Sequence, residues 1–458
     1  MYVGKQDHML SNKKAKVLVI LKSVTLLIWM QLYIMRAQTT HIIPIKGATS
    51  LLVGGIIPTE NGNIITLTKN SKSQVAVSVT KEAIEVSSEI SFPQKFYVLN
   101  AFSSDNIRLT LGEIYPKVNI KEVSFVSTLD KNASIQDYKL FTVENGFSEV
   151  FDATIINNNT IAIAGMGEIR AIATYGMVPA SVMLPQAVLI LMSPSLSFQK
   201  AYYITLPGEN KYVWRLFRIE AISETDIVVA GEVYSEWDNE QNSPLNNMPF
   251  VARISIDGTV KWAYSIPQRG HINELVIGSD GTIWLFYTDL SMSGTYAVNL
   301  SPSTGQLINS FYIKDFVANN TIIYENHLVC AGKLNTGKTI EAGILIINPS
   351  SQNVYTTPVI RINAKLSDGA KVSPMDIKVF RNGESLGLAA SLLGIVGDKS
   401  FIIITDIDFN SLKSISAVQK RNQINVTLQD EKNITLETTK IVDLKEFKGQ
   451  VRNEKKNY

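Results

Sequence analysis

The sequence predicts an all-β protein: a single β-propeller of about seven four-stranded blades that follows an N-terminal export signal. Three observations predict it, namely a hairpin pattern that recurs along the chain, a strand-forming composition, and no convincing helical periodicity beyond the N-terminus. Of the 458 residues, 45% are hydrophobic and 18% are charged. This charged share lies below the roughly 25% of ordinary soluble domains, and together with abundant Ile, Val and Thr it favours sheets over a helical bundle.

The N-terminus has the layout of a secretory signal peptide, which we expect to span residues 1–38. Three lysines (Lys13, Lys14 and Lys16) precede an apolar stretch at 17–35, and Ala37 follows as a small residue near a cleavage site. The alternative is an uncleaved signal anchor. Cleavage near Ala37 is favoured because Lys22, inside the stretch, would cost about 2.5–3.5 kcal/mol at the centre of a bilayer. Residues after 38 are therefore expected to be exported, to the medium or to the cell surface.

The repeated unit is a short apolar strand, a polar turn and a second strand. Seven such hairpins pair 75–80 with 83–90, 123–129 with 135–141, 187–192 with 198–205, 250–256 with 259–266, 296–300 with 306–313, 343–347 with 354–360, and 401–405 with 412–418. The fourth is the clearest because Asp257-Gly258 lies at its turn, and this dipeptide suits the positive φ angles of a type I′ turn.

Two further strands precede each hairpin, so the unit has four strands. The apolar strands directly before the hairpins cover 64–67, 107–112, 160–165, 226–231, 282–286, 327–332 and 386–390. Four antiparallel strands at a spacing of about 45 to 65 residues describe a propeller blade, which buries both of its faces only against neighbouring blades. We expect the propeller to occupy residues 39–419. Two or three stacked sandwiches are the alternative architecture.

The two ends are expected to behave differently. Of the β-prone runs at 41–45 and 51–55, one is expected to begin the first blade and the other to pair with the last blade and close the ring. The charged C-terminal segment, 420–458, is expected to form a hairpin between 424–428 and 434–436 and then a disordered tail.

Composition excludes several classes of protein. The single cysteine, Cys330, excludes an intrachain disulfide and is expected to be a buried core thiol. The net charge of +2, with no basic cluster in the body of the chain, excludes a typical nucleic-acid-binding protein. Six sequons are candidate N-glycosylation sites, at Asn132, Asn158, Asn299, Asn319, Asn425 and Asn433.

One stretch resembles a known repeat family. Residues 251–262, which contain Asp257-Gly258 and Trp262, resemble the SBBP and delta-60 type repeats of prokaryotic propellers. The resemblance implies the architecture and is typical of exported proteins, but it implies no activity.

The same stretch is similar to a sialidase Asp-box with its glycine one position early. Residues 217–220 are similar to the sialidase arginine motif, with Glu220 where proline is usual. We interpret both as ordinary turn chemistry, because three arginines and a tyrosine nucleophile cannot be assembled from this chain. No motif for a metal, a cofactor or a catalytic nucleophile is present, so no cofactor is expected.

Two insertions are the candidate binding elements. One, at 234–242, lengthens the fourth blade and contains Glu236, Trp237 and Asp238; the other, at 168–186, lengthens the third blade and contains Tyr175. Long loops on a rigid scaffold commonly carry binding groups, so these four residues are the predicted binding residues.

The leading functional hypothesis is a non-enzymatic binding or structural module at the cell surface, with a protein or a glycan as partner. It is expected to contact a membrane only if the N-terminal segment is retained. A glycan-active hydrolase or lyase is the first alternative, and an axial pocket lined by converging Arg, Asp, Glu or Tyr would favour it. The second alternative is a filament or surface-layer subunit that donates residues 40–46 to a neighbour. If both insertions emerge on one rim, that rim is the expected binding face.

Overall fold

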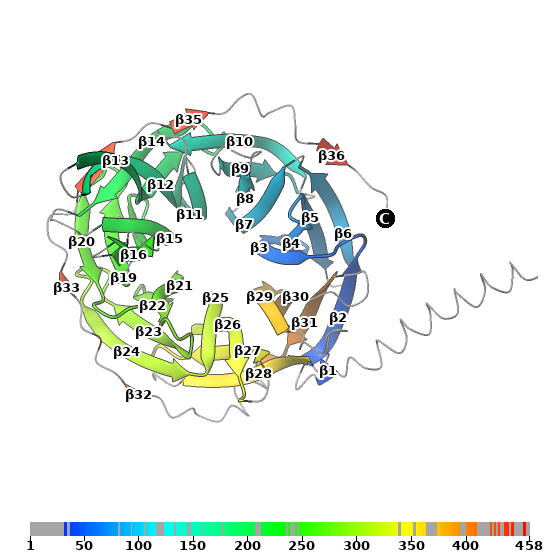
Figure 1. Ribbon diagram of the computed structural model, residues 1–458. Coiled ribbons are helices and arrows are strands. Elements are labelled where there is room, and N and C mark those ends of the chain that lie inside the picture. The colour runs from blue at the N-terminus through cyan, green and yellow to red at the C-terminus, as the bar shows by residue number, and fades with distance from the viewer. Residues whose placement is uncertain are drawn as a thin grey trace, which may run out of the picture.

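The computed structural model is a closed ring of seven antiparallel sheets (Figure 1). It describes residues 32–33, 37–80, 83–92, 94–104, 107–115, 123–131, 134–143, 148–157, 159–175, 178–206, 212–234, 237–238, 243–244, 247–337, 340–350, 354–362, 373–393, 400–409, 422–423, 426, 429–430, 435–438, 441–443 and 452–454. The predicted seven-bladed propeller is confirmed.

The first four blades follow one another along the chain, each from its inner to its outer strand. Blade 1 contains β3 (Leu51–Thr59), β4 (Gly62–Lys69), β5 (Ser73–Thr80) and β6 (Ile84–Ser91). Blade 2 contains β7 (Lys95–Ser104), β8 (Ile107–Tyr115), β9 (Val123–Leu129) and β10 (Ile135–Val143). Blade 3 contains β11 (Ser148–Asn157), β12 (Thr160–Tyr175), β13 (Val178–Met192) and β14 (Phe198–Thr205). Blade 4 contains β15 (Tyr212–Ala221), β16 (Asp226–Tyr234), β19 (Met248–Ser255) and β20 (Val260–Ser265).

The remaining blades complete the ring. Blade 5 contains β21 (His271–Ile277), β22 (Ile283–Thr288), β23 (Gly294–Leu300) and β24 (Leu307–Lys314). Blade 6 contains β25 (Phe316–Tyr324), β26 (His327–Asn335), β27 (Ile340–Ile347) and β28 (Val354–Ile362). Blade 7 contains β29 (Ser373–Asn382), β30 (Ser385–Leu393) and β31 (Ser400–Ile407), and its outer strand is β2 (Ala37–Ile45) from the other end of the chain.

Strand β2 closes the ring. It runs antiparallel to β31, with Thr40 opposite Thr405 and Ile45 opposite Ser400. The expectation that one N-terminal run begins the first blade while the other pairs with the last blade is confirmed. The seventh predicted hairpin is wrong in its outer strand, because β2 occupies the edge of β31 that was assigned to 412–418. Residues 412–418 themselves lie outside the described residues.

Short strands from the C-terminal segment lie along the outside of the ring. They are β32 (Asn422–Gln423), β33 (Gln429–Asp430), β34 (Thr435–Thr438), β35 (Ile441–Asp443) and β36 (Arg452–Glu454), which pair with the outer strands of blades 5, 4, 3, 2 and 1 in that order. We call them the C-terminal belt (Figure 1). The expected hairpin is not formed by the described residues, because β33 and β34 pair with different blades. Strand β1 (Leu32–Tyr33) extends blade 6 in the same way.

The core lies between the blades. Buried apolar residues form clusters that each draw on two neighbouring blades, and the second strand of blade 4, β16, is buried at all nine positions. Such a strand is covered on both faces, so its side chains need not alternate between apolar and polar. Cys330 on β26 is fully buried, as expected, and helps to join blades 5 and 6.

Candidate functional site

The centre of the ring is lined by the seven inner strands, and each inner strand contains a β-bulge at about its middle. The bulges shift the register after Val53, Val98, Val150, Leu216, Ile272, Ala318 and Met375. A bulge leaves a residue unpaired and turns the neighbouring side chains in a new direction. In each blade, one residue of the inner strand is the first to pair with the second strand again after the bulge. These seven residues occupy the same structural position in their blades.

We call these seven equivalent positions the axial ring. They are Gly55, Asn100, Asp152, Arg218, Glu274, Asn320 and Lys378. Six of the seven are polar or charged, although the inner strands are otherwise largely apolar. Blade 1 carries glycine because the backbone of blade 2 is close: a Cβ on Gly55 would lie 2.3 Å from the Ala101 nitrogen.

Asp152 links three blades. Its Oδ1 accepts hydrogen bonds from Asn100 Nδ2 of blade 2 at 2.6 Å and from the Ala153 backbone at 2.9 Å, and its Oδ2 accepts one from the Ile219 nitrogen of blade 4 at 3.1 Å. Burial raises its pKa to about 6, and the negative charge of Glu274 adds to the rise, while Arg218 and the two backbone N–H groups oppose it.

Other members of the axial ring also join neighbouring blades. Arg218 Nε donates to Glu274 Oε1 of blade 5 at 3.1 Å, and the Leu275 nitrogen donates to the same oxygen at 3.2 Å. Asn320 Oδ1 of blade 6 accepts a hydrogen bond from the Val379 nitrogen of blade 7 at 3.0 Å. Much of the hydrogen-bonding capacity of these side chains thus holds the ring together.

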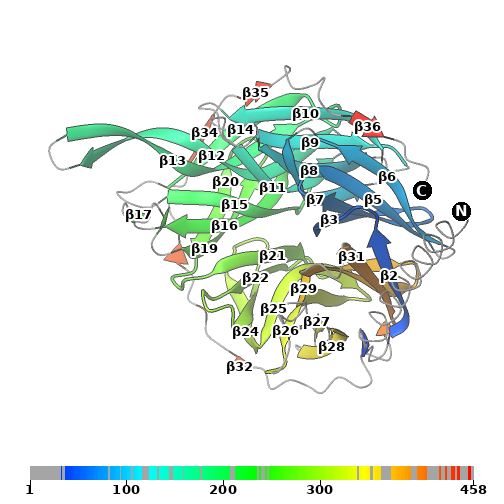
Figure 2. The same cartoon turned by 45° about the vertical axis from the view of Figure 1, so that its right-hand side comes forward.

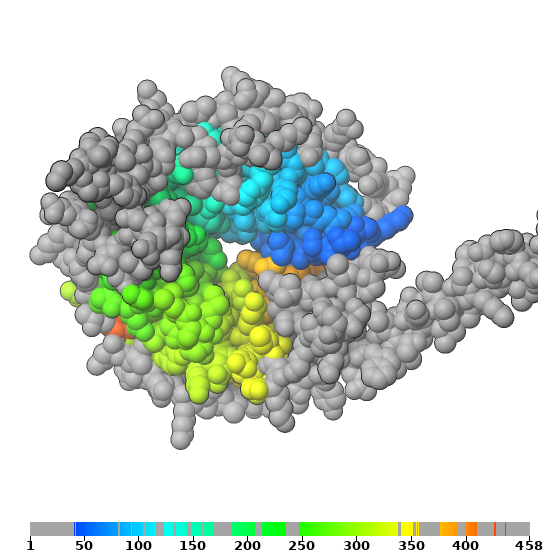
Figure 3. Space-filling view, viewed as in Figure 1, coloured from blue at the N-terminus to red at the C-terminus, as the bar shows by residue number. Residues whose placement is uncertain are grey.

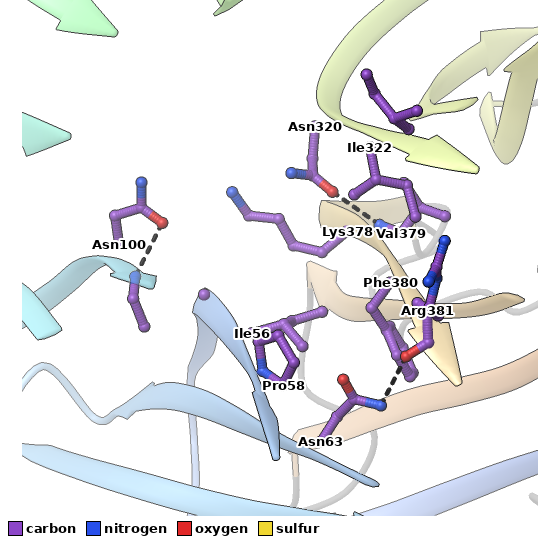
Figure 4. A pocket seen from close by; sticks show the side chains of 13 residues that line it. Ile56, Pro58, Asn63, Asn100, Asn320, Ile322, Lys378, Val379, Phe380 and Arg381 are labelled. Atoms are coloured by element: carbon purple, nitrogen blue, oxygen red, sulfur yellow. Dashed lines mark hydrogen bonds between the residues drawn. The ribbon is translucent and has the colours of Figure 1, made fainter. Parts of the chain in front are cut away.

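Two cavities open on this ring, with volumes of about 230 and 290 Å³. Both are lined by Asn100, Asn320 and Lys378, and we call them together the axial channel. The centre of the ring is hollowed in the space-filling view (Figure 3), and Figure 4 shows residues that line the smaller cavity. The larger cavity also takes in Arg218, Glu220 and Glu274. The interpretation of 217–220 as turn chemistry was wrong: these residues lie in β15, and Arg218 and Glu220 line the channel.

Two charged side chains in the channel differ from the rest. Within the described residues, neither Lys378 nor Glu220 makes a side-chain hydrogen bond or ion pair. Burial lowers the pKa of Lys378, and the charge of Arg218 lowers it further. Burial raises the pKa of Glu220 well above its ordinary value, and the charges of Asp152 and Glu274 add to the effect. Both side chains therefore favour their neutral forms more than they would in water.

Both insertions emerge on the face of the ring where the inner strands begin. In blade 3, Gly167 lies opposite Gln186, and β12 and β13 continue beyond this pair to Tyr175 and Val178. In blade 4, the insertion follows Tyr234, which is paired with Tyr212 at the start of β15. Figure 2 shows the β12–β13 hairpin and β17 (Trp237–Asp238) extending to the same side. We call this side the insertion face.

The insertion face also carries exposed apolar side chains. Of the four large exposed hydrophobic residues among those described, Leu290 and Met292 lie between β22 and β23 and Ile340 begins β27, all at this end of their blades. The fourth, Ile308, lies on the outer strand β24. The insertion face thus also carries exposed apolar side chains on blades 5 and 6.

A polar cluster lies beneath the insertion of blade 4. The Arg215 guanidinium lies 3.2 Å from the centre of the Trp214 ring, and His271 Nδ1 lies 3.0 Å from Oε1 of the fully buried Glu232. The hydrogen bond to Glu232 raises the pKa of His271. Within the described residues, Arg215 Nε and Glu232 Oε2 are buried without a hydrogen-bond partner, which is unusual in folded proteins. His271 begins β21.

The predicted binding residues are only partly described. Trp237 and Asp238 form β17, which pairs with β18 (Ser243–Pro244), and Tyr175 ends β12 opposite Val178. Glu236 lies outside the described residues. The candidate glycosylation site Asn299 lies in β23, and only 4% of the residue is exposed. Asn319 lies in β25 with its Oδ1 buried, and the other four sequon asparagines lie outside the described residues.

Sequence reasoning missed the axial ring. Six of the seven inner strands carry a polar residue at this position, but the bulge that aligns these residues leaves no distinctive sequence. Within the described part of the chain no group of His, Cys, Asp and Glu is arranged to hold a metal ion. Those residues also contain no helix of the length and hydropathy needed to cross a membrane.

Comparison with known proteins does not place the chain in a family. No family model matches the chain, and no curated protein matches it. The resemblance to SBBP and delta-60 type repeats therefore extends only to the propeller architecture.

Several solved structures are similar at low identity. The chain resembles polysaccharide lyase Uly1 (9% identity, TM-score 0.47, covering 82% of this chain and 100% of the lyase) and Saccharomyces cerevisiae Sqt1 (8%, 0.45, 82% and 100%). It also resembles Trypanosoma rangeli sialidase (10%, TM-score 0.45), covering 83% of this chain and 60% of the sialidase chain. Likeness at this level says nothing about activity.

Proposed function

We propose that this chain is an exported, non-enzymatic binding propeller that holds a protein partner on its insertion face. The observation that carries the proposal is that both insertions emerge on one face, from the adjacent blades 3 and 4. Exposed Leu290, Met292 and Ile340 extend the same face over blades 5 and 6, and protein interfaces are built around such apolar side chains. Trp237 and Tyr175 belong to the insertions and are the proposed contacts.

Export is consistent with the way the ring closes. The regular pairing of β2 with β31 begins at Thr40, after a bulge that follows Ala37. Cleavage near Ala37 would therefore leave the closing strand intact. The filament hypothesis is not proposed further, because the strand that it would donate to a neighbour is paired within its own ring.

Site-specific crosslinking tests the binding face. Cys330 is fully buried and burial raises its pKa to about 12, so an added surface cysteine would be the only reactive thiol among the described residues. A photo-crosslinker attached to Met292→Cys is expected to give a protein adduct when the full chain is incubated with surface extracts of its source cells. The same reagent on Ile308→Cys, exposed on the outer strand β24, is the matched control.

Shortened insertions make this test specific. Because Glu168 lies directly opposite Pro185, residues 169–184 can be replaced by Asn-Gly as a two-residue hairpin turn. The adduct from Met292→Cys is expected to weaken in this variant, since part of the contact surface is removed. Equal adducts from both cysteines, or an adduct that is unchanged by shortening the hairpin, would contradict the proposal.

A glycan-active enzyme is the second candidate, because the channel brings together Arg218, Asp152, Glu220 and Glu274. A carboxyl that keeps its proton at near-neutral pH can act as a general acid, and the raised pKa values of Glu220 and Asp152 favour that role. The binding function is preferred because Asp152 and Glu274 already accept hydrogen bonds from neighbouring blades. Among the described residues that line the two cavities there are two arginines and no tyrosine, so a sialidase-like set is not assembled.

An assay for glycan cleavage distinguishes the two candidates. Release of reducing ends or of unsaturated sugars from a panel of extracellular glycans, abolished by Glu220→Gln, would favour the enzyme. If the purified chain releases neither, while crosslinking on the insertion face succeeds, the binding function stands.

A further inference from the structure

We propose that the axial channel binds a small oxyanion, the carboxylate or phosphate group of a small molecule, on Lys378. The inference concerns a site that is separate from the insertion face and does not depend on the partner proposed there. It is carried by one feature: a cation inside the ring, at the wall of two cavities, with no group of the described protein bound to it.

Lys378 is placed by the widest of the bulges. The register of β29 passes from Met375 directly to Lys378, and Asp376 within the bulge has a φ of 47°, a left-handed conformation that is uncommon outside glycine. Figure 4 shows the Lys378 side chain extending from β29 into the space between Asn320 and Asn100. A strained backbone that directs a charged side chain into a cavity is the arrangement expected of a binding residue.

A hydrogen-bond donor is still available beside Lys378. Asn320 Oδ1 is occupied by the Val379 nitrogen, which leaves the Asn320 Nδ2 group without a hydrogen bond among the described residues. Several of the nearby acceptor atoms are engaged, because Glu274 Oε1 accepts hydrogen bonds from Arg218 and Leu275 and both oxygens of Asp152 are bonded. An ammonium and an amide N–H group side by side favour the oxygens of an anion.

Among the described residues, none of the charged groups that face Lys378 forms an ion pair with it. They come from Asp152 on β11, Arg218 and Glu220 on β15, Glu274 on β21, and Asp376 on β29 itself. Arg218 and Glu274 form a direct ion pair at 3.1 Å, Asp376 accepts a hydrogen bond from Ser391, and both oxygens of Asp152 accept hydrogen bonds from other groups. A bound anion would give Lys378 a direct partner and would hold the proton on it.

The size of the channel restricts the ligand. Cavities of about 230 and 290 Å³ that share part of their lining lie at or below the lower end of the range for small-molecule sites, which favours a small ligand. The residues of the larger cavity lie after the bulges, toward the ends of the inner strands. The ligand therefore enters from the side opposite the insertions.

Calorimetric titration of the full chain tests the site. The probes are acetate and inorganic phosphate, and glucose serves as the uncharged control. We expect saturable binding of at least one anion and none of glucose. Lys378→Met is expected to weaken anion binding about tenfold or more, because it removes a charge-assisted hydrogen bond. Lys314→Met, at an exposed position on β24, is the matched control and should bind as the unaltered chain does.

The comparison of acetate with phosphate assigns the ligand chemistry, since tighter acetate binding indicates a carboxylate and tighter phosphate binding a phosphate. Lys378→Met is expected to fold, because it replaces an unpaired cation by an apolar side chain of similar length. Glucose binding without anion binding, or equal anion binding by Lys378→Met, would overturn the proposal. A failure here leaves the insertion-face adduct unaffected, so the two proposals can fail separately.

The pH dependence gives an independent check. Affinity for the anion is expected to fall as the pH rises through about 6, because Asp152 then gains a negative charge beside the site. In Asp152→Asn, the fall in anion affinity near pH 6 should be absent. Affinity that instead increases with pH would contradict an anion bound to Lys378.

Discussion

Asp152 shows how one buried carboxylate can be both a structural link and a source of pH sensitivity. Three hydrogen bonds from blades 2, 3 and 4 stabilise its charged form, yet the residue is only 9% exposed and burial outweighs them. The folded protein therefore holds a proton on Asp152 at a pH where the unfolded chain, with an ordinary aspartate pKa near 4, has already lost it.

The free energy of unfolding is accordingly expected to decrease as the pH rises from about 4 to about 6. In this window the folded state binds more protons than the unfolded state, and stability then decreases with increasing pH. The contribution of Asp152 is about 3 kcal/mol, since each unit of pKa difference corresponds to about 1.4 kcal/mol. Urea denaturation at several pH values should show that the free energy of unfolding of Asp152→Asn depends less steeply on pH than that of the unaltered chain.

The control for this measurement is Glu224→Gln, an exposed carboxyl between β15 and β16. It should leave the pH dependence unchanged. If Asp152→Asn follows the same curve as the unaltered chain, Asp152 ionises at its ordinary pKa and the burial argument is wrong.

At the level of elements, β2 is expected to decide whether the ring stays closed. Chains that begin at residue 38 retain the pairs from Thr40 to Ile45, whereas chains that begin at residue 46 expose the edge of β31 and lose the buried Ile45. An unpaired edge next to an apolar core favours association with other chains. We expect the first truncation to melt as the full chain does and the second to melt at a clearly lower temperature or to aggregate.

Circular dichroism melts and size-exclusion chromatography distinguish the two truncations. Loss of the native melt on starting at residue 38 would place essential contacts in β1 and the segment before it, and would also argue against cleavage near Ala37.

The C-terminal belt is expected to protect outer edges and not to build the blades. A chain that ends at residue 419 keeps all seven four-stranded blades but exposes the outer strands of blades 1 to 5. It also loses the burial of Val426, which is 8% exposed and packs near Trp262, at a cost of about 2 kcal/mol. We therefore expect a folded protein that associates as its concentration rises, measured by light scattering after size-exclusion chromatography.

The matched control ends at residue 446 and removes only β36, so that one blade edge is exposed. This variant should associate less with rising concentration than the chain that ends at residue 419. If the chain ending at 419 stays monomeric at high concentration, the belt does not protect these edges.

The strands could be predicted from sequence because their signals are local. Residues 250–256 and 259–266 became β19 and β20 within two residues, since an Asp-Gly turn and apolar runs fix a hairpin without reference to the rest of the chain. The belt could not be predicted in the same way. Its strands have two to four residues and their partners lie far away in sequence, as with Thr438 and Tyr202.

The axial ring could not be predicted from sequence for a related reason. A bulge changes which face a side chain takes, and no residue type in these strands requires one. Arg218 and Glu220 belong to the run 217–220 that is similar to the sialidase arginine motif. Only the folded structure, with the register of β15 against β16, shows that both residues line the channel. Equivalence of positions across seven blades is a property of the closed ring and not of any one repeat.

At the scale of the whole molecule, the two proposed sites lie at opposite ends of the ring. The insertions project where the inner strands begin, and the larger cavity is lined by residues toward the ends of those strands, such as Thr154 and Glu220. The axial ring, which contains Lys378, includes no residue of either insertion, and its hydrogen bonds join neighbouring blades at the centre. Sites that share no residue and no mobile element are expected to act independently.

We therefore expect Lys378→Met and the hairpin-shortened variant to have separate effects. Replacing residues 169–184 by Asn-Gly should leave the affinity for acetate or phosphate unchanged within a factor of about two, because no channel residue is altered. Lys378→Met should in turn leave the crosslinked adduct from Met292→Cys unchanged. The double variant should show both losses, each equal to its value alone. A weaker anion affinity in the hairpin variant would mean that the two ends of the ring are energetically coupled, and a two-state rearrangement of the blades would then have to connect them.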